Sequence, residues 1–438
     1  MMSLNSRNAP ALDLPARFMG LSIASLALAV FSAPWTLPLM QGQFNGFRLL
    51  ALVHLMTLGF IGSMIIGASY QLVPVALQVP LSSVTLGRMS FPFYLGGLVL
   101  FLTGLLREWL PGLAIGGFLL GIAFVLYIVV IARTFLRSSH KDAVAWHIAL
   151  ASVLSGTGMV LGVMLAFNKG NGFLAGRLLD VLAAHIIVML VGWVTITYTG
   201  VAYRLVGMFT LAEKHVSERQ AWIALGLFGG GTILLALRFM PGLPAMVGWF
   251  GATMILGGGV LFSLQLRRMY RKRMRRTFDI HMPFAIASAA MLLLAAGSLF
   301  AGLVLGTSPA NPLWVATGWL VIFGMVSTAI QGFFYKISTF LVWLKRYAPV
   351  AGTQPVPKLE EMYSRTLGMT GFWLWTAAIA GGWLALVLEH PWLPLVGLLL
   401  VAGAFCFVFN VVNIARHWMP SMRSLLAVAI HPGTGVRA

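Results

Sequence analysis

Charged residues are scarce in this sequence. Only 9% of its 438 residues are charged and 59% are hydrophobic, whereas a typical soluble protein has about 25% charged residues. Uncharged runs such as 89–106 and 115–132 approach the roughly 20 apolar residues that cross a bilayer. The 48 glycines agree with this, because helices in lipid pack closely through small residues. The composition predicts an all-α, polytopic membrane protein and excludes a soluble one.

Cysteine and acidic residues are also rare, and each shortage excludes a class of site. Cys406 is the only cysteine, so the chain can form neither an internal disulfide nor a thiolate metal site of its own. Most of the ten Asp and Glu residues fall in expected loops or tails, whereas proton-coupled transporters usually place acids at mid-membrane. No phosphate-binding loop, dinucleotide-binding motif, zinc spacing or nucleophile elbow occurs in a credible context. No residue is therefore predicted to be catalytic, and the sequence does not decide whether the protein is an enzyme.

Apolar runs bounded by Pro, Gly or charged residues predict about twelve transmembrane helices. The second, sixth and tenth are longer than a bilayer requires, so they must tilt, kink or project beyond it. The predicted ranges are 18–38, 49–76, 89–106, 112–133, 145–168, 180–209, 220–237, 244–266, 281–305, 313–343, 367–388 and 393–415.

Basic residues alternate in step with these helices. If the N-terminus is cytoplasmic, the Lys and Arg residues that fall on the outer side are Arg48, Arg107, Lys169, Arg177 and Arg238. All the others lie on the cytoplasmic side, and the segment 267–276 alone carries seven. By the positive-inside rule, both termini are predicted to be cytoplasmic, with tails over 1–17 and 416–438. The net charge of +19 then needs no nucleic acid as a partner, and the lipid bilayer is the expected one.

Three of the predicted helices share a pattern of glycine and tyrosine. Each reads Gly, seven residues, Gly, two residues, Tyr, a polar residue, and Leu or Ile, beginning at Gly59, Gly192 and Gly324. These glycines are four predicted helices apart, which predicts three pseudo-repeated four-helix units over 18–135, 145–268 and 279–415. The smooth stripe would let a neighbouring backbone or a flat cofactor approach closely. We interpret the Tyr and its polar neighbour as an interfacial aromatic with a snorkelling side chain.

Four histidines lie in or at the edge of predicted spans. Ionisable groups inside a bilayer are uncommon and often functional, and imidazole binds both heme iron and copper. His54 and His185, in the outer third of the second and sixth helices, are the candidate metal ligands. The alternative is a packed histidine that donates to a carbonyl of a neighbouring helix. His147 and His281 are first-turn residues expected to meet water or headgroups, and no role is assigned to them.

The register of the two candidate ligands argues against one shared heme. His54 stands five residues before its repeat glycine and His185 seven before. On regular α-helices these positions differ by about 160°. The two histidines are therefore not equivalent, and a single heme bridged by both is not expected.

The motifs around these histidines resemble the heme-binding helix of subunit I of the heme–copper oxidases, with the closest likeness to C-type oxidases and nitric oxide reductases. The first copy is the stretch 54–60, HLMTLGF, followed by Gly67 and by 70–74, YQLVP. The second is Ala184-His185 with 191–193, VGW. The stretch 54–64 is also similar to a motif of the NnrS family, which are twelve-helix membrane proteins containing heme and copper and linked to nitric oxide metabolism.

The chain departs from this family's complete ligand set. The copper site of an oxidase needs an adjacent pair of histidines on the seventh helix, but 220–237 contains no histidine. On the tenth helix, Thr317 and Trp319 stand where the heme ligands would be. A complete oxygen or nitric oxide reductase centre therefore cannot be built in the family's way.

The resemblance implies an oxidase-subunit-I-like protein of the bacterial inner membrane with a reduced set of cofactors. It would bind heme b, with copper as a second candidate, through His54 and His185, beside Gly59 and Gly192. It would serve electron transfer, nitric oxide handling or a respiratory assembly, with a cytochrome or other respiratory subunits as partners. If it is an enzyme, it would be a heme-dependent oxidoreductase. The alternatives are a heme-free transporter or channel and a non-catalytic scaffold of a redox complex.

Overall fold

The structure is a computed structural model that describes residues 12–42, 45–239, 242–275, 277–307 and 311–418. Within these ranges, twelve helical segments are long and apolar enough to cross a membrane, as the sequence predicts. They are Asp13–Met40 (α1 and η2), Phe47–Ala76 (α2, η3, α3), Val84–Leu106 (α4), Leu110–Arg137 (α5), Ala143–Asn171 (α6), Leu178–Thr210 (α7, η4, α8), Glu218–Leu237 (α9), Ala245–Arg271 (α10), His281–Val304 (α11), Pro312–Arg346 (α12, η6, α13), Arg365–Val387 (α14) and Leu393–Arg416 (α15).

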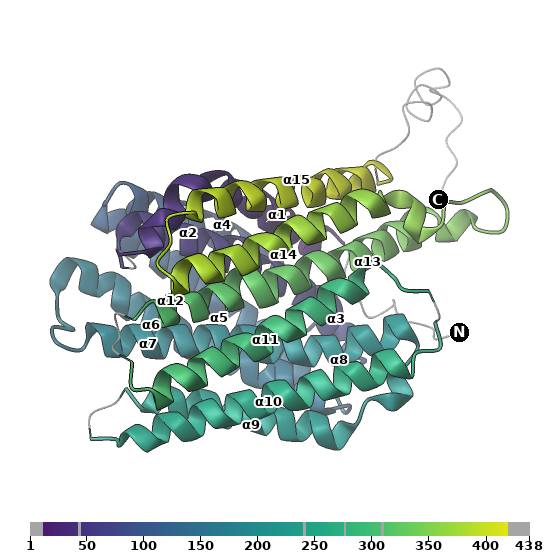
Figure 1. Cartoon of the computed structure of the whole chain (residues 1–438). Coiled ribbons are helices and arrows are strands. Elements are labelled where there is room, and N and C mark those ends of the chain that lie inside the picture. Colours follow the sequence, from purple (N-terminus) through teal and green to yellow (C-terminus); the bar gives the residue numbers. More distant parts are fainter. Residues whose placement is uncertain (1–11, 43–44, 240–241, 276, 308–310, 419–438) are drawn as a thin grey trace.

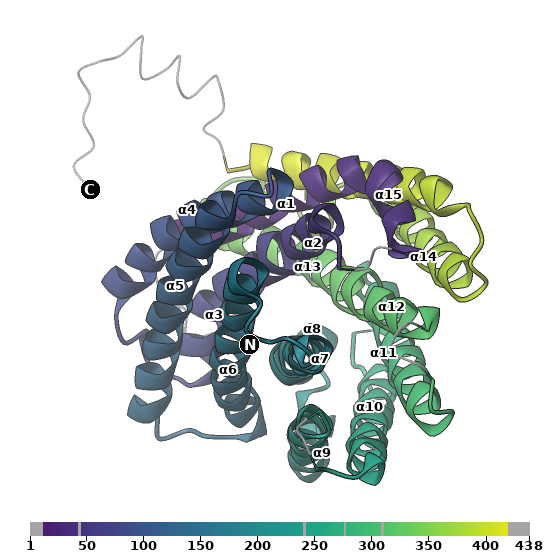
Figure 2. The ribbon, with the colours of Figure 1, turned by 90° about the vertical axis from the view of Figure 1, so that its left-hand side faces the viewer.

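The helices lie alongside one another as a single bundle (Figure 1). Viewed end-on, α4 and α5, α9 and α10, and α14 and α15 form neighbouring pairs on the outside, and α1 packs against α15 (Figure 2). The spans that contain α3, α8 and α13 lie further inside (Figure 2). The long helix α10 faces outward next to α9 and α11. The fold thus has an inner set of three spans and an outer layer of nine among the described residues.

The three inner spans are also the longest, with 30, 33 and 35 residues, and each changes its hydrogen-bonding pattern midway. A π-helical segment interrupts each of them, with bonds that reach five residues instead of four. The segments are η3 (Leu55–Gly62) between α2 (Phe47–His54) and α3 (Ser63–Ala76), η4 (Val188–Thr195) between α7 (Leu178–Ile187) and α8 (Ile196–Thr210), and η6 (Leu320–Val326) between α12 (Pro312–Trp319) and α13 (Ser327–Arg346).

A hydroxyl side chain lies at the end of each π-helical segment. Ser63 donates to the carbonyl of Leu58 at 3.3 Å, and Thr195 donates to Leu190 at 2.8 Å. The third bond, from Ser327 to the carbonyl of Ile322, is 2.6 Å long. Each hydroxyl therefore satisfies a carbonyl five residues back, at the point where the regular α-helical ladder is interrupted.

The glycine stripe of these spans serves close packing between helices. At the second glycine of each pattern, an added Cβ would collide with the Cβ of a residue on the preceding spanning helix; the pairs are Gly67 with Phe18, Gly200 with His147, and Gly332 with Phe284. The sequence predicted this close approach of backbones. Its interpretation of the following tyrosines as interfacial is wrong, because Tyr70, Tyr203 and Tyr335 are at most 1% exposed.

Candidate functional site

His54 is the last residue of α2, immediately before the π-helical segment η3. Its Nδ1 lies 2.8 Å from the carbonyl oxygen of Leu50, one turn earlier. A carbonyl only accepts hydrogen bonds, so Nδ1 carries the proton and Nε2 keeps its lone pair. The ring packs against Phe101 of α4, with 5.1 Å between the ring centroids. His54 is thus held in one orientation with its ligating nitrogen free.

The ring of His185 is also held by a hydrogen bond to a backbone carbonyl, but here the carbonyl belongs to a neighbouring helix. Its Nδ1 lies 2.8 Å from the carbonyl oxygen of Gly158 on α6, so its Nε2 also keeps a lone pair. The ring fits against Gly162, one turn further along α6, where an added Cβ would lie 2.9 Å from the ring carbon Cε1. Gly162 therefore makes the room that this ring needs, and Gly158 contributes the carbonyl that accepts its hydrogen bond. The alternative prediction was a packed histidine that donates to a carbonyl of a neighbouring helix. The Nδ1 of His185 makes such a bond, and its Nε2 is still available as a ligand.

The structure brings His54 and His185 within electrostatic range of each other. Both side chains are only partly buried, although they lie within spanning segments. The sequence argument that set their registers about 160° apart assumed regular α-helices. The segments η3 and η4 both begin four residues before the repeat glycine, so they turn both histidines alike and the offset between the two positions remains. That offset compares positions within the repeat and does not set how side chains of two different spans lie relative to each other. The two positions are not equivalent in the pattern, and yet their imidazoles are within range of an electrostatic interaction.

Gly59 and Gly192, which the sequence assigned to cofactor binding, lie against neighbouring helices. An added Cβ at Gly59 would come within 2.8 Å of the Ser25 side chain on α1 (Asp13–Thr36). At Gly192 it would come within 2.9 Å of the Leu154 side chain on α6. In this structure both glycines make room for a helix, and their assignment to a cofactor stays a prediction.

His147 and His281 do not meet water or headgroups, so that part of the sequence interpretation is wrong. Both side chains are completely buried. His147 donates from Nδ1 to the carbonyl of Ala143 at 2.7 Å, and its ring meets the edge of Tyr203. His281 lies between the rings of Phe209 and Phe333. Their place beside basic loops in the sequence did not reveal how deeply the helix starts are covered by neighbouring spans.

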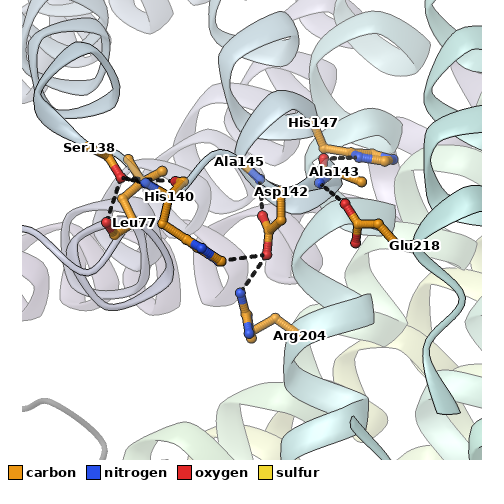
Figure 3. A network of polar contacts seen from close by, with 9 residues as sticks. All are labelled: Leu77, Ser138, His140, Asp142, Ala143, Ala145, His147, Arg204 and Glu218. Carbon is orange, nitrogen blue, oxygen red and sulfur yellow. Dashed lines mark hydrogen bonds and ion pairs between the residues drawn. The ribbon is translucent and has the colours of Figure 1, made fainter. Parts of the chain in front are cut away.

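A second polar feature, which the sequence interpretation missed, lies around the start of α6. Asp142 caps this helix by accepting the Ala145 N–H at 2.9 Å, and the same carboxylate pairs with Arg204 of α8 at 2.8 Å (Figure 3). His140 lies 3.4 Å from it, and Glu218 accepts the Ala143 N–H at 2.6 Å (Figure 3). The polar residue of the glycine–tyrosine pattern, Arg204, is therefore an ion-pair partner and not a snorkelling side chain.

The third copy of the pattern forms a more buried ion pair. Lys336 of α13 lies 2.6 Å from Asp279, and both side chains are less than 10% exposed. Arg275 lies 3.5 Å from the same carboxylate. Burial raises the pKa of Asp279, but the hydrogen bond from Lys336 together with the positive charges of Lys336 and Arg275 outweighs burial and lowers the pKa from its ordinary value. This pair could not be predicted from the sequence, because Asp279 precedes the start of α11 and lies far from Lys336 along the chain.

A small apolar cavity lies where the inner spans meet. Its volume is about 90 Å³, and it is lined by residues of α3, α8 and α13 that include Ile65, Val201 and Ile330. Neither His54 nor His185 lines it. The cavity is therefore separate from the paired histidines.

The candidate ligands of the site are these two imidazoles. Over the residues that the structure describes, no group of three or more His, Cys, Asp or Glu side chains is placed to hold a metal ion. The chain matches no protein-family model and no curated protein sequence. The geometry of the two histidines is thus the observation on which a function has to be built.

Proposed function

We propose that the chain consists of three diverged copies of one four-helix unit, over 18–135, 145–268 and 279–415. Two observations support this. The second helix of each proposed unit carries one of the π-helical segments, η3, η4 or η6. The second glycine of each pattern packs against a residue on the first helix of the same unit. In all three units that residue stands five positions after an aspartate, which is Asp13, Asp142 or Asp279.

We also propose that both termini are cytoplasmic. Labelling of single cysteines tests this orientation, and Cys406→Ser gives the background because Cys406 is the only cysteine and is buried. The exposed positions Asn171 and Lys214 lie at opposite ends of the span Leu178–Thr210. A membrane-impermeant thiol reagent should label Asn171→Cys in intact cells and Lys214→Cys only after lysis. The reverse result would contradict the orientation.

For the site, we propose that His54 and His185 together form a two-imidazole site for heme b, with copper as the second candidate. The chain would then be an oxidase-subunit-I-like redox protein of the bacterial inner membrane, without a complete oxygen-reducing centre, working in electron transfer, nitric oxide handling or a respiratory assembly. The observation that carries this proposal is that both Nδ1 atoms donate to backbone carbonyls. Metal-bound histidines usually have such a bond on the nitrogen that faces away from the metal.

The donor chemistry fits the proposed groups. Neutral imidazole nitrogen is a ligand for heme iron and for copper. The carbonyls of Leu50 and Gly158 fix the tautomer of each ring, and Phe101 and Gly162 fix its position. A heme held there would supply one-electron transfer. The protein's own contribution is to orient the two rings in a water-poor part of the bundle.

A reduced-minus-oxidised visible spectrum of the purified full-length protein, with iron and copper analysis, tests the proposal. We expect a heme b band that is lost in both His54→Gln and His185→Gln. Copper without heme would select the second candidate. A colourless, metal-free protein that is folded by circular dichroism would refute the site and leave transport or scaffolding as the function.

His147→Gln is the matched control. This histidine also lies within a span and also donates from Nδ1 to a backbone carbonyl, but its Nε2 is buried without a partner. We expect His147→Gln to keep the spectrum and the metal content of the wild type. Equal loss in all three variants would mean that the histidines act through folding and not as ligands.

A further inference from the structure

One end of α10 carries exposed cations that have no carboxylate partner. Arg267, Arg268, Arg271 and Lys272 are all exposed within six residues of chain. All ten Asp and Glu residues of the chain lie in the described ranges, and none of them forms an ion pair with these four cations. The anions that balance this charge must therefore come from outside the chain.

The same face of α10 continues from these cations as an apolar, outward-facing stripe. Leu264 and Val260 are 50% and 41% exposed, and they precede Arg267 by three and seven residues. Residues three, four and seven apart share one face of an α-helix. The stripe continues to Phe250, which is 62% exposed. This face of α10 is thus suited to contact acyl chains along its length and negative charge at its end.

The length of the stripe places the cations at the depth of lipid headgroups. Trp249, 44% exposed, lies near the opposite end of α10, and exposed tryptophans are typical of the membrane interface. From Trp249 to Arg267 the helix rises about 27 Å, close to the roughly 30 Å of a hydrocarbon core. With Trp249 at one interface, Arg267 and Arg268 lie at the other.

The segment after the cations also suits a membrane surface. Met274 and Phe278 are 75% and 43% exposed, and Met274 stands between the partly exposed Arg273 and Arg275. Mixed exposed apolar and cationic side chains favour burial at the boundary between headgroups and acyl chains. An acidic soluble protein would match the charge but not these apolar side chains or the lipid-facing stripe.

We propose that the end of α10, Arg267, Arg268, Arg271 and Lys272, binds the phosphates of anionic phospholipid headgroups in the adjacent leaflet. Guanidinium groups pair with phosphate through two hydrogen bonds, and basic clusters directly beside a spanning helix favour anionic lipids. The site is distinct from the histidines and does not depend on a cofactor there.

Lipid titration of the purified full-length protein in detergent tests this site. The readouts are the binding of fluorescent phosphatidylglycerol and the rise in the midpoint of thermal unfolding, with phosphatidylcholine and inorganic phosphate as comparisons. We expect phosphatidylglycerol to bind and stabilise the wild type far more than phosphatidylcholine. Arg267→Gln/Arg268→Gln/Arg271→Gln/Lys272→Gln should weaken its binding more than tenfold, since each cation near an anionic surface contributes about fivefold.

Two further variants make the result specific. The matched control removes four exposed cations from elsewhere, Arg133→Gln/Lys345→Gln/Arg346→Gln/Lys358→Gln, and should lose much less lipid binding than the site variant, because these cations are divided among different segments. Replacing the three arginines of the site by lysine keeps the charge and should retain most of the binding. Equal loss in the control, unchanged binding in the fourfold site variant, or equal stabilisation by inorganic phosphate would each overturn the proposal.

Discussion

The buried pair between Asp279 and Lys336 leads to an asymmetric prediction about stability. Removing one partner of a buried ion pair costs about 3–5 kcal/mol, because the other charge stays buried without compensation. Asp279→Asn leaves Lys336 without the carboxylate, next to the Phe209 ring, whose centroid is 5.9 Å from its Nζ. We therefore expect Asp279→Asn to lower the free energy of unfolding by about 3–5 kcal/mol.

The opposite substitution should cost less. In Lys336→Met, the carboxylate of Asp279 keeps Arg275 at 3.5 Å, although this arginine is 36% exposed and its charge is screened by water. We expect a loss of about 1–3 kcal/mol. The double variant Asp279→Asn/Lys336→Met should be more stable than Asp279→Asn alone, because no unpaired charge is left in the buried site.

Equilibrium unfolding in mixed detergent–dodecyl sulfate micelles measures these differences as a double-mutant cycle. Arg88→Gln is the control, since its pair with Asp13 is half-exposed on both sides and should contribute little to stability. Equal losses for Asp279→Asn and Arg88→Gln would refute the reasoning from burial. A larger loss for Lys336→Met than for Asp279→Asn would refute the reasoning from Arg275.

The pKa of Asp279 and the glycine stripe lead to two further predictions. Because Lys336 and Arg275 lower the pKa of Asp279 in the folded protein, its stabilising effect should be fully present above the unfolded-state pKa and disappear as the pH falls through the lower folded-state pKa. The unfolding free energies of the wild type and Asp279→Asn should therefore converge only below the unfolded-state pKa in an acid titration. Gly200→Ala should destabilise the protein by about 1–3 kcal/mol, because the new Cβ collides with His147. Gly121→Ala, with no atom within 4 Å of its new Cβ, should stay within about 1 kcal/mol of the wild type in the same unfolding assay.

Much of the fold could be predicted from the sequence because hydropathy alone sets which segments cross a bilayer. The predicted range 49–76 and the observed Phe47–Ala76 differ by two residues at one end, and the second, sixth and tenth spans are the longest, as predicted. The π-helical segments could not be predicted in this way. They depend on neighbours such as Tyr94, whose hydroxyl donates to the carbonyl of Leu58 inside η3, and this bond exists only when the third span is in place.

The candidate site could also be predicted only in part. The sequence identified His54 and His185 as intramembrane imidazoles, since their types and positions are local facts. How they lie relative to each other could not be predicted, because it depends on where the spans Phe47–Ala76 and Leu178–Thr210 are placed in the bundle. The burial of His281 and the partner of Lys336 were missed for the same reason: both depend on which helix starts lie side by side.

The interruption of the inner spans divides each of them into two helices with separate registers. A residue deleted from a continuous α-helix turns the part of the helix before it by about 100° relative to the part after it. Deleting one residue from the π-helical segment Leu55–Gly62 would return that stretch toward α-helical spacing. Because the wider turns of the π-helical segment hold an additional residue, such a deletion should turn the half that carries His54 much less than a deletion within α2 would. The segment therefore makes the direction of this histidine tolerant of a one-residue change in length at that place, which a continuous α-helix is not.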